Sequence, residues 1–236
     1  MKLRLLAAAI AAFTLVAGTA AAQDTTSEKG KLSYAIGYNT GAELADLTAR
    51  GEAVDVNTVI KALQDGYAKK EPTVGVDQLR VAVENMQKRQ QAKMEAEFAK
   101  LSSANKTASD AFLAQNKSKA GVKELPGGVQ YRVIEAGNGA KPTQASDVQL
   151  TYKGSLPDGT VLVDTSQVAA GQTPGPVALK VSQVPLDGLR EALLQMPSGA
   201  RWEVVIPGNK AYGSDMRAGR MANQAVVFDV KLVSVK

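Results

Sequence analysis

Val226-Val227-Phe228-Asp229-Val230-Lys231-Leu232 (residues 226–232) places a bulky apolar side chain at every second position. Successive side chains of a strand point to opposite faces, so this period predicts a strand with one buried face. The same alternation recurs at 129–133, 148–152, 177–181 and 202–206. One short segment, 186–196, has helix spacing instead. The pattern predicts an α+β domain over 121–236, an antiparallel sheet wrapped over one short helix.

The residues before this domain have the spacing of helices. Within 23–75, apolar residues recur every three or four positions, with a break at Gly51: Leu32, Ile36, Leu44, Leu47, Val59, Ile60, Leu63 and Tyr67. This predicts an all-α N-terminal domain over 23–75.

Residues 76–120 contain neither glycine nor proline. Their apolar residues keep helix spacing but form a thin stripe: Leu79, Val83, Met86, Met94, Phe98 and Leu101. One continuous connecting helix of this length would be about 68 Å long. A solvated linker is one interpretation, which residues 102–119 fit well. The other interpretation is that the part before Leu101 helps to build a dimer, in which a second copy of the chain covers the stripe, and we expect a homodimer.

The first 22 residues resemble a cleavable signal peptide. Lys2 and Arg4 are followed by an uncharged apolar segment, 5–16, and by small residues that end at Ala22. A membrane anchor is the alternative, but a spanning helix needs about 20 apolar residues. We therefore expect cleavage after Ala22 and export to the periplasm, with outer-membrane attachment or secretion left open.

The amino-acid composition excludes several classes of catalytic and binding site. The chain contains no Cys and no His, which excludes thiol nucleophiles, histidine-dependent triads and ordinary zinc sites. A Gly-Lys-Ser/Thr phosphate loop is missing. Without residues 1–22 the net charge is +3, with no basic block interleaved with aromatic residues, so we expect no nucleic-acid partner. No later segment is apolar enough to span a bilayer. Any reaction should need no cofactor and no metal.

Several motifs point to one family. Residues 128–139 (GVQYRVIEAGNG), 152–161 (YKGSLPDGTV), 210–213 (KAYG) and 226–230 (VVFDV) resemble, in this order, segments of FK506-binding-protein-type prolyl isomerases. Residues 32–38 (LSYAIGY), followed by a long helix, are similar to the dimerisation domain of macrophage infectivity potentiators and their periplasmic relatives. The resemblance covers nearly all of the chain after residue 22.

The resemblance implies a set of site residues. Tyr152 and Phe228 would form aromatic walls around a proline ring, although strand positions are also compatible with a purely core role. Tyr212 would donate its hydroxyl to a substrate carbonyl, and Asp164 would accept a hydrogen bond at the pocket edge. The backbone N–H of Leu186 would be a second carbonyl donor. Rotation about an Xaa-Pro bond needs no nucleophile, which agrees with the composition.

The chain departs from the family pattern inside this pocket. Segment 162–164 carries Val163 where the family has an aromatic residue, and it is one residue longer. The family's tryptophan floor is replaced by Leu189, a further aromatic wall by Val177, and the usual capping segment contains Met221. With Leu186, these are the expected substrate-binding residues. A wider and softer pocket predicts weakened catalysis on proline peptides.

Two functions follow from these features. The first is a prolyl isomerase and folding chaperone for unfolded or partly folded exported polypeptides. The second is a holdase or binding module that has lost turnover but still binds apolar segments. A purely structural envelope protein is a third interpretation, which no motif supports.

Overall fold

The computed structural model describes residues 24–167 and 174–236. Contacts divide the chain into two units, one ending at Gln87 and the other formed by Lys88–Lys236. Each unit is described by itself. The expected signal peptide, residues 1–22, lies outside the described residues. In the described part of the chain, no helix combines the length and hydropathy needed to cross a membrane.

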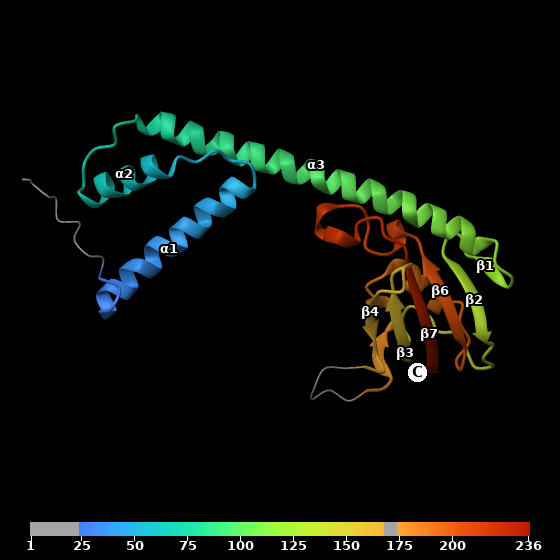
Figure 1. The fold of residues 1–236 in the computed structure, drawn as a ribbon. Helices are drawn as coiled ribbons and strands as arrows, with labels where there is room; N and C mark the ends of the chain where they lie inside the picture. Colours follow the sequence, from blue (N-terminus) through green and yellow to red (C-terminus); the bar gives the residue numbers. More distant parts are fainter. Residues whose placement is uncertain (1–23, 168–173) are drawn as a thin grey trace, which may run out of the picture. The chain divides into compact units, whose positions relative to one another are not determined.

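The first unit contains helices α1 (Glu28–Ala49) and α2 (Val56–Tyr67) and the beginning of α3 (Val76–Lys117) (Figure 1). Side-chain oxygens cap α1 and α2 at their N-termini. Ser27 Oγ accepts the Gly30 N–H at 3.0 Å, and Asp55 accepts the Thr58 N–H at 2.6 Å. Such caps satisfy amide groups that have no partner inside the helix. The all-α N-terminal region is therefore confirmed.

The second unit is an antiparallel sheet whose strands run in the order β1-β2-β6-β7-β3-β4, with β5 paired to β3. The strands are β1 Val122–Glu124, β2 Gln130–Glu135, β3 Asp147–Ser155, β4 Val161–Asp164, β5 Val177–Lys180, β6 Arg201–Ile206 and β7 Val226–Val235. Short helices connect them: η1 Val181–Gln183, α4 Asp187–Leu193, η2 Gly208–Lys210 and η3 Met216–Met221. The expected α+β fold is confirmed.

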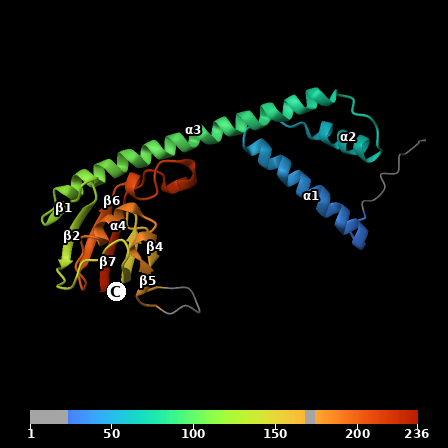
Figure 2. The ribbon, with the colours of Figure 1, turned by 180° about the vertical axis from the view of Figure 1, so that it is seen from behind.

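The core lies between one face of the sheet and α4 (Figure 2). Leu189, Ala192 and Leu193 of α4 are buried against alternate residues of the central strands. Gly188 allows this close packing, because a Cβ there would lie 2.4 Å from Ile206 Cγ2. The apolar residues at alternate positions of β6 and β7 are therefore the ones that are buried against α4.

Leu162 forms a β-bulge between β3 and β4. Gly154 pairs with Val163, but the next residue, Ser155, pairs with Val161. Leu162 is therefore the extra residue, and the pairing skips it. The bulge keeps Val163 opposite Gly154, and it is one way for the strand to accommodate the extra residue that the family resemblance implies.

Helix α3 ends at Lys117, close to the expected residue 120. Its C-terminal part has a buried polar face, formed by Ser102, Asn105, Ser109 and Asn116. The interpretation of residues 102–119 as a solvated linker is therefore wrong for this face. Polar side chains satisfied by hydrogen bonds can be buried as well as apolar ones.

Candidate active site on β3, β4, β7 and the following loops

Tyr152 on β3 and Phe228 on β7 place two aromatic rings side by side, with centroids 6.1 Å apart and planes tilted by 51°. Phe228 is 4% exposed and belongs to the core, against which Tyr152 packs with its partly buried side chain. Tilted rings at this separation attract one another beyond simple area burial. We call this pair the aromatic wall.

Gly154 makes room for the aromatic wall. It pairs with Phe228 on one side and with Val163 on the other. A Cβ at residue 154 would lie 2.8 Å from Phe228 Cε1 and 3.0 Å from Val163 Cγ1, both too close for a real contact. The missing side chain therefore leaves room for the Phe228 ring and the Val163 side chain. Val163 is 38% exposed, so this end of the wall is open to solvent.

Asp164 follows Val163 but pairs with Lys153. Its carboxylate accepts hydrogen bonds from the Ser166 hydroxyl at 2.6 Å and the Ser166 N–H at 2.9 Å. These bonds, and more weakly the charge of Lys153, hold the pKa of Asp164 below its ordinary value. The group is therefore an ionised acceptor at neutral pH.

Asp164 and Tyr152 border a polar hollow of about 350 Å³. Its other residues come from four strands and the β4 loop: Glu135, Thr151, Lys153, Thr165, Ser166, Arg201, Asp229 and Lys231. Ion pairs cross it, with Arg201 bound to Asp229 at 2.6 Å and Lys231 to Glu135 at 2.8 Å. Asp164 thus shares its face of the sheet with Lys153 and Asp229, whereas Val163 shares the opposite face with Phe228, so the strand pairing does not bring the carboxylate to the aromatic wall.

Leu189 and Leu186 lie below the wall in the same core. Leu189 is 5% exposed, and Leu186, the residue before α4, is 8% exposed. The Leu186 carbonyl accepts the Arg190 N–H at 3.0 Å, while among the described residues its own N–H donates to no backbone carbonyl. This amide is thus available to another acceptor. Met221 packs partly buried against the core, and Val177, on β5, is 39% exposed.

Tyr212 lies on a loop that follows η2, with 40% of its side chain exposed. The Gly213 N–H donates to the Gly208 carbonyl at 2.9 Å and closes this loop. An ion pair of 2.7 Å between Lys210 and Glu191 joins the loop to α4 and raises the pKa of Lys210. The phenol is therefore accessible from solvent, and its role as a donor to a substrate carbonyl stays a prediction.

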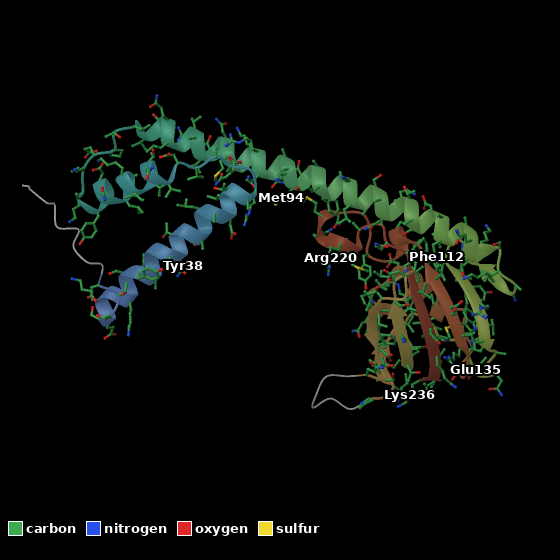
Figure 3. All side chains as sticks on the ribbon, in the orientation of Figure 1. Tyr38, Met94, Phe112, Glu135, Arg220 and Lys236 are labelled. Atoms are coloured by element: carbon green, nitrogen blue, oxygen red, sulfur yellow. The ribbon has the colours of Figure 1, made fainter. Side chains whose placement is uncertain are left out.

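Residues on α3 belong to this region, and sequence reasoning missed them. Asn105 Nδ2 donates to the Arg220 carbonyl at 3.1 Å and the Ala222 carbonyl at 2.9 Å, on both sides of Met221. Ser109 Oγ donates to the Asn223 carbonyl at 2.9 Å. Figure 3 labels Arg220 on the loop next to α3. The sequence did contain a signal for this contact: the polar residues at 102, 105, 109 and 116 are spaced so that they lie on one face of the helix.

Comparisons with known proteins agree with this geometry. A family model described as "FKBP-type peptidyl-prolyl cis-trans isomerase" matches residues 138–233, and one described as "Domain amino terminal to FKBP-type peptidyl-prolyl isomerase" matches residues 29–133. The outer membrane protein MIP of Legionella longbeachae is 39% identical, covering 100% of this chain and 99% of its own. The chain belongs to the FKBP-type peptidyl-prolyl cis-trans isomerases.

Two further relatives extend the likeness of this FKBP-type chain. The peptidyl-prolyl cis-trans isomerase Mip of Coxiella burnetii is 34% identical over 94% of both chains. The crystal structure of FkpA from Escherichia coli matches with a TM-score of 0.67 at 26% identity, covering 89% of this chain and 98% of that one. All of the predicted pocket residues lie in the range 138–233, and their individual roles stay predictions. The described residues contain no cluster of side chains placed to hold a metal ion.

Proposed function

We propose that this FKBP-type chain isomerises Xaa-Pro bonds of exported polypeptides in the site built on the aromatic wall. The observation that carries the proposal is the contact of Tyr152 with Phe228 over the space left by Gly154. A planar amide is stabilised by charge separation between N and O, and twisting it removes that separation. An apolar surface therefore favours the twisted form and lowers a barrier of about 18–20 kcal/mol.

The polar groups around the wall suggest a division of roles. Tyr212, exposed on its closed loop, would donate to a substrate carbonyl. The N–H of Leu186, which donates to no backbone carbonyl of the described residues, would be the second donor. Asp164, an ionised acceptor, would accept a hydrogen bond from the peptide at the edge of the pocket. Each role asks only for a hydrogen bond, and none requires proton transfer.

We further propose that turnover is slower than in relatives with a fully aromatic pocket. Val163 and Val177 supply small aliphatic surfaces where rings would stack on the substrate, and both are more than a third exposed. Leu189 offers no flat floor. Weaker contact with the twisted amide lowers kcat, since only interactions present in the transition state accelerate the step.

The chaperone function rests on the N-terminal unit. Helices α1 and α2 expose a set of large apolar side chains: Leu32, Tyr34, Ile36, Tyr38, Ile60, Leu63 and Tyr67. Exposed apolar surface on this scale favours association, and a second copy of the same helices is the proposed partner. A homodimer would offer two sites to one unfolded polypeptide and bind it more tightly than either site alone. The sequence of residues 1–22 supports a periplasmic location.

The alternative is a holdase without turnover, which the aliphatic residues at 163, 177 and 189 favour. A protease-coupled assay on a proline tetrapeptide, run beside a client-aggregation assay, separates the two. We expect Tyr212→Phe and Asp164→Ala to lower catalysis while suppression of aggregation persists. A wild-type protein that suppresses aggregation but shows no catalysis would establish the holdase instead.

A further inference from the structure

The loop that carries Tyr212 is held at both ends by one residue, Asn223. The Asn223 N–H donates to the Gly213 carbonyl at 2.8 Å, directly after Tyr212. At the other end, a Cβ on Gly208 would lie 2.4 Å from the Asn223 carbonyl carbon, so the two backbones are in direct contact. The position of Tyr212 therefore depends on where Asn223 lies.

Asn223 in turn is held by α3. Its side-chain amide donates to Ser102 Oγ at 2.8 Å, and its carbonyl accepts the Ser109 hydroxyl at 2.9 Å. Asn223 has a φ of +58°, a left-handed conformation that asparagine tolerates better than most residues. This conformation directs both the side chain and the carbonyl to the helix.

The neighbouring residues of the loop are held by the same helix face. Ser109 Oγ also accepts the Ala225 N–H at 2.8 Å, which uses this hydroxyl as donor and acceptor at once. Asn105 donates to the Arg220 and Ala222 carbonyls, and its Oδ1 accepts the Gln224 side-chain amide at 2.9 Å. Ser109 is 2% exposed and Asn105 is 7% exposed, so water does not replace these bonds easily.

The contact is local to the second unit and is visible from two sides. Figure 1 and Figure 2 both show the C-terminal part of α3 running along the loop before β7. Met221 and Tyr212 are both proposed ligand contacts: α3 holds the segment of Met221 directly, and it holds the loop of Tyr212 through Asn223.

We infer that Ser102 and Ser109 are positioning residues for isomerisation, acting through Asn223 on Tyr212, while Asn105 holds the neighbouring residues of the same loop. This inference rests on the proposed function, because it assigns these residues to the same site. It makes the C-terminal part of α3 a component of the catalytic unit. A variant that breaks the contact should lose activity because the Tyr212 hydroxyl is no longer held in place.

A double-mutant cycle in the full-length chain tests the inference. We expect Ser109→Ala to lower kcat/KM on a short proline peptide about three- to tenfold, the range set by a lost hydrogen bond, mainly through kcat. In a Tyr212→Phe background the same change should have little further effect, since the hydroxyl that it positions is gone. Equal losses in both backgrounds, or wild-type activity of Ser109→Ala, would overturn the inference.

Two milder variants, Ser102→Ala and Ser103→Ala, distinguish a loss of positioning from misfolding. Ser102→Ala removes one hydrogen bond to Asn223, and we expect a smaller loss in the same direction. Ser103→Ala is the matched control, because Ser103 is exposed on the same helix, and it should leave kcat/KM unchanged. Equal activity of Ser102→Ala and Ser103→Ala would contradict the positioning role.

Amide hydrogen exchange separates this inference from the proposed function. If the wild-type chain shows no isomerase activity, the proposed function fails, while exchange at the Asn223 N–H still reports the contact. Faster exchange in Ser109→Ala than in Ser103→Ala would support the link from α3 to the Tyr212 loop. Unchanged exchange would refute it.

Discussion

Gly154 and Phe228 face each other across β3 and β7, and the Phe228 ring fills the space that a side chain on residue 154 would need. Gly154→Ala should therefore push the ring and Val163 apart. Overpacking of this kind costs about 1–3 kcal/mol in the free energy of unfolding. Chemical denaturation measures this loss, and kcat/KM should fall with it. Gly75→Ala is the control, because a Cβ there meets only Gln78 Oε1, at 3.7 Å.

Val163 offers a place to restore an aromatic surface. Val163 pairs with Gly154, which pairs with Phe228 on its other side, and it is 38% exposed, so a larger residue can extend toward solvent. We expect Val163→Phe to raise kcat/KM about two- to tenfold, the range that one aromatic contact supplies. Leu162→Phe, at the adjacent bulge position, should leave the rate unchanged. A similar gain in both variants would show that general hydrophobicity, and not the wall, sets the rate.

The pH dependence follows from Asp164. Ser166 lowers the pKa of this carboxyl in the folded chain. The ionised carboxylate therefore stabilises the fold at pH values above 3.8, the pKa of the group in the unfolded chain. That contribution is lost as the pH falls through the lowered pKa. With no histidine in the chain, we expect kcat/KM to be flat between about pH 5 and pH 8.

Removing the Ser166 hydroxyl checks the cause of this shift. An NMR titration of the Asp164 carboxyl should show a higher pKa in Ser166→Ala than in the wild type, because the strongest hydrogen bond is gone. Identical titration curves would mean that Ser166 does not set the pKa of Asp164.

The exposed apolar face of α1 tests the dimer. Ile36 is 61% exposed, and a charge there would be buried in the proposed interface. We expect Ile36→Glu to halve the mass measured by light scattering, while Asn39→Glu, at an exposed polar position of the same helix, keeps the wild-type mass. A monomeric wild-type chain would refute the dimer directly.

Much of the fold was predictable because strands and helices have different periods. Alternation at 226–232 marked β7, whereas the bulge at Leu162 appears only in the pairing of β3 with β4. The role of Phe228 was harder to decide, since its contact with Tyr152 depends on the pairing of β3 with β7.

The docking of α3 was not predicted for a physical reason. Its buried face is made of serine and asparagine, so a search for apolar spacing does not detect it. The partners of Ser102, Asn105 and Ser109 lie more than 100 residues further along the chain, in a loop whose path only the folded structure shows.

Exchange NMR on a proline peptide tests the central claim most directly. Cross-peaks between the cis and trans forms report the rate of interconversion without a coupling protease, and unaided interconversion takes tens to hundreds of seconds. The wild-type chain should accelerate this exchange, and Tyr212→Phe should reduce the acceleration about tenfold, as the loss of one hydrogen bond allows. Exchange no faster with the wild-type chain than without it would contradict the account.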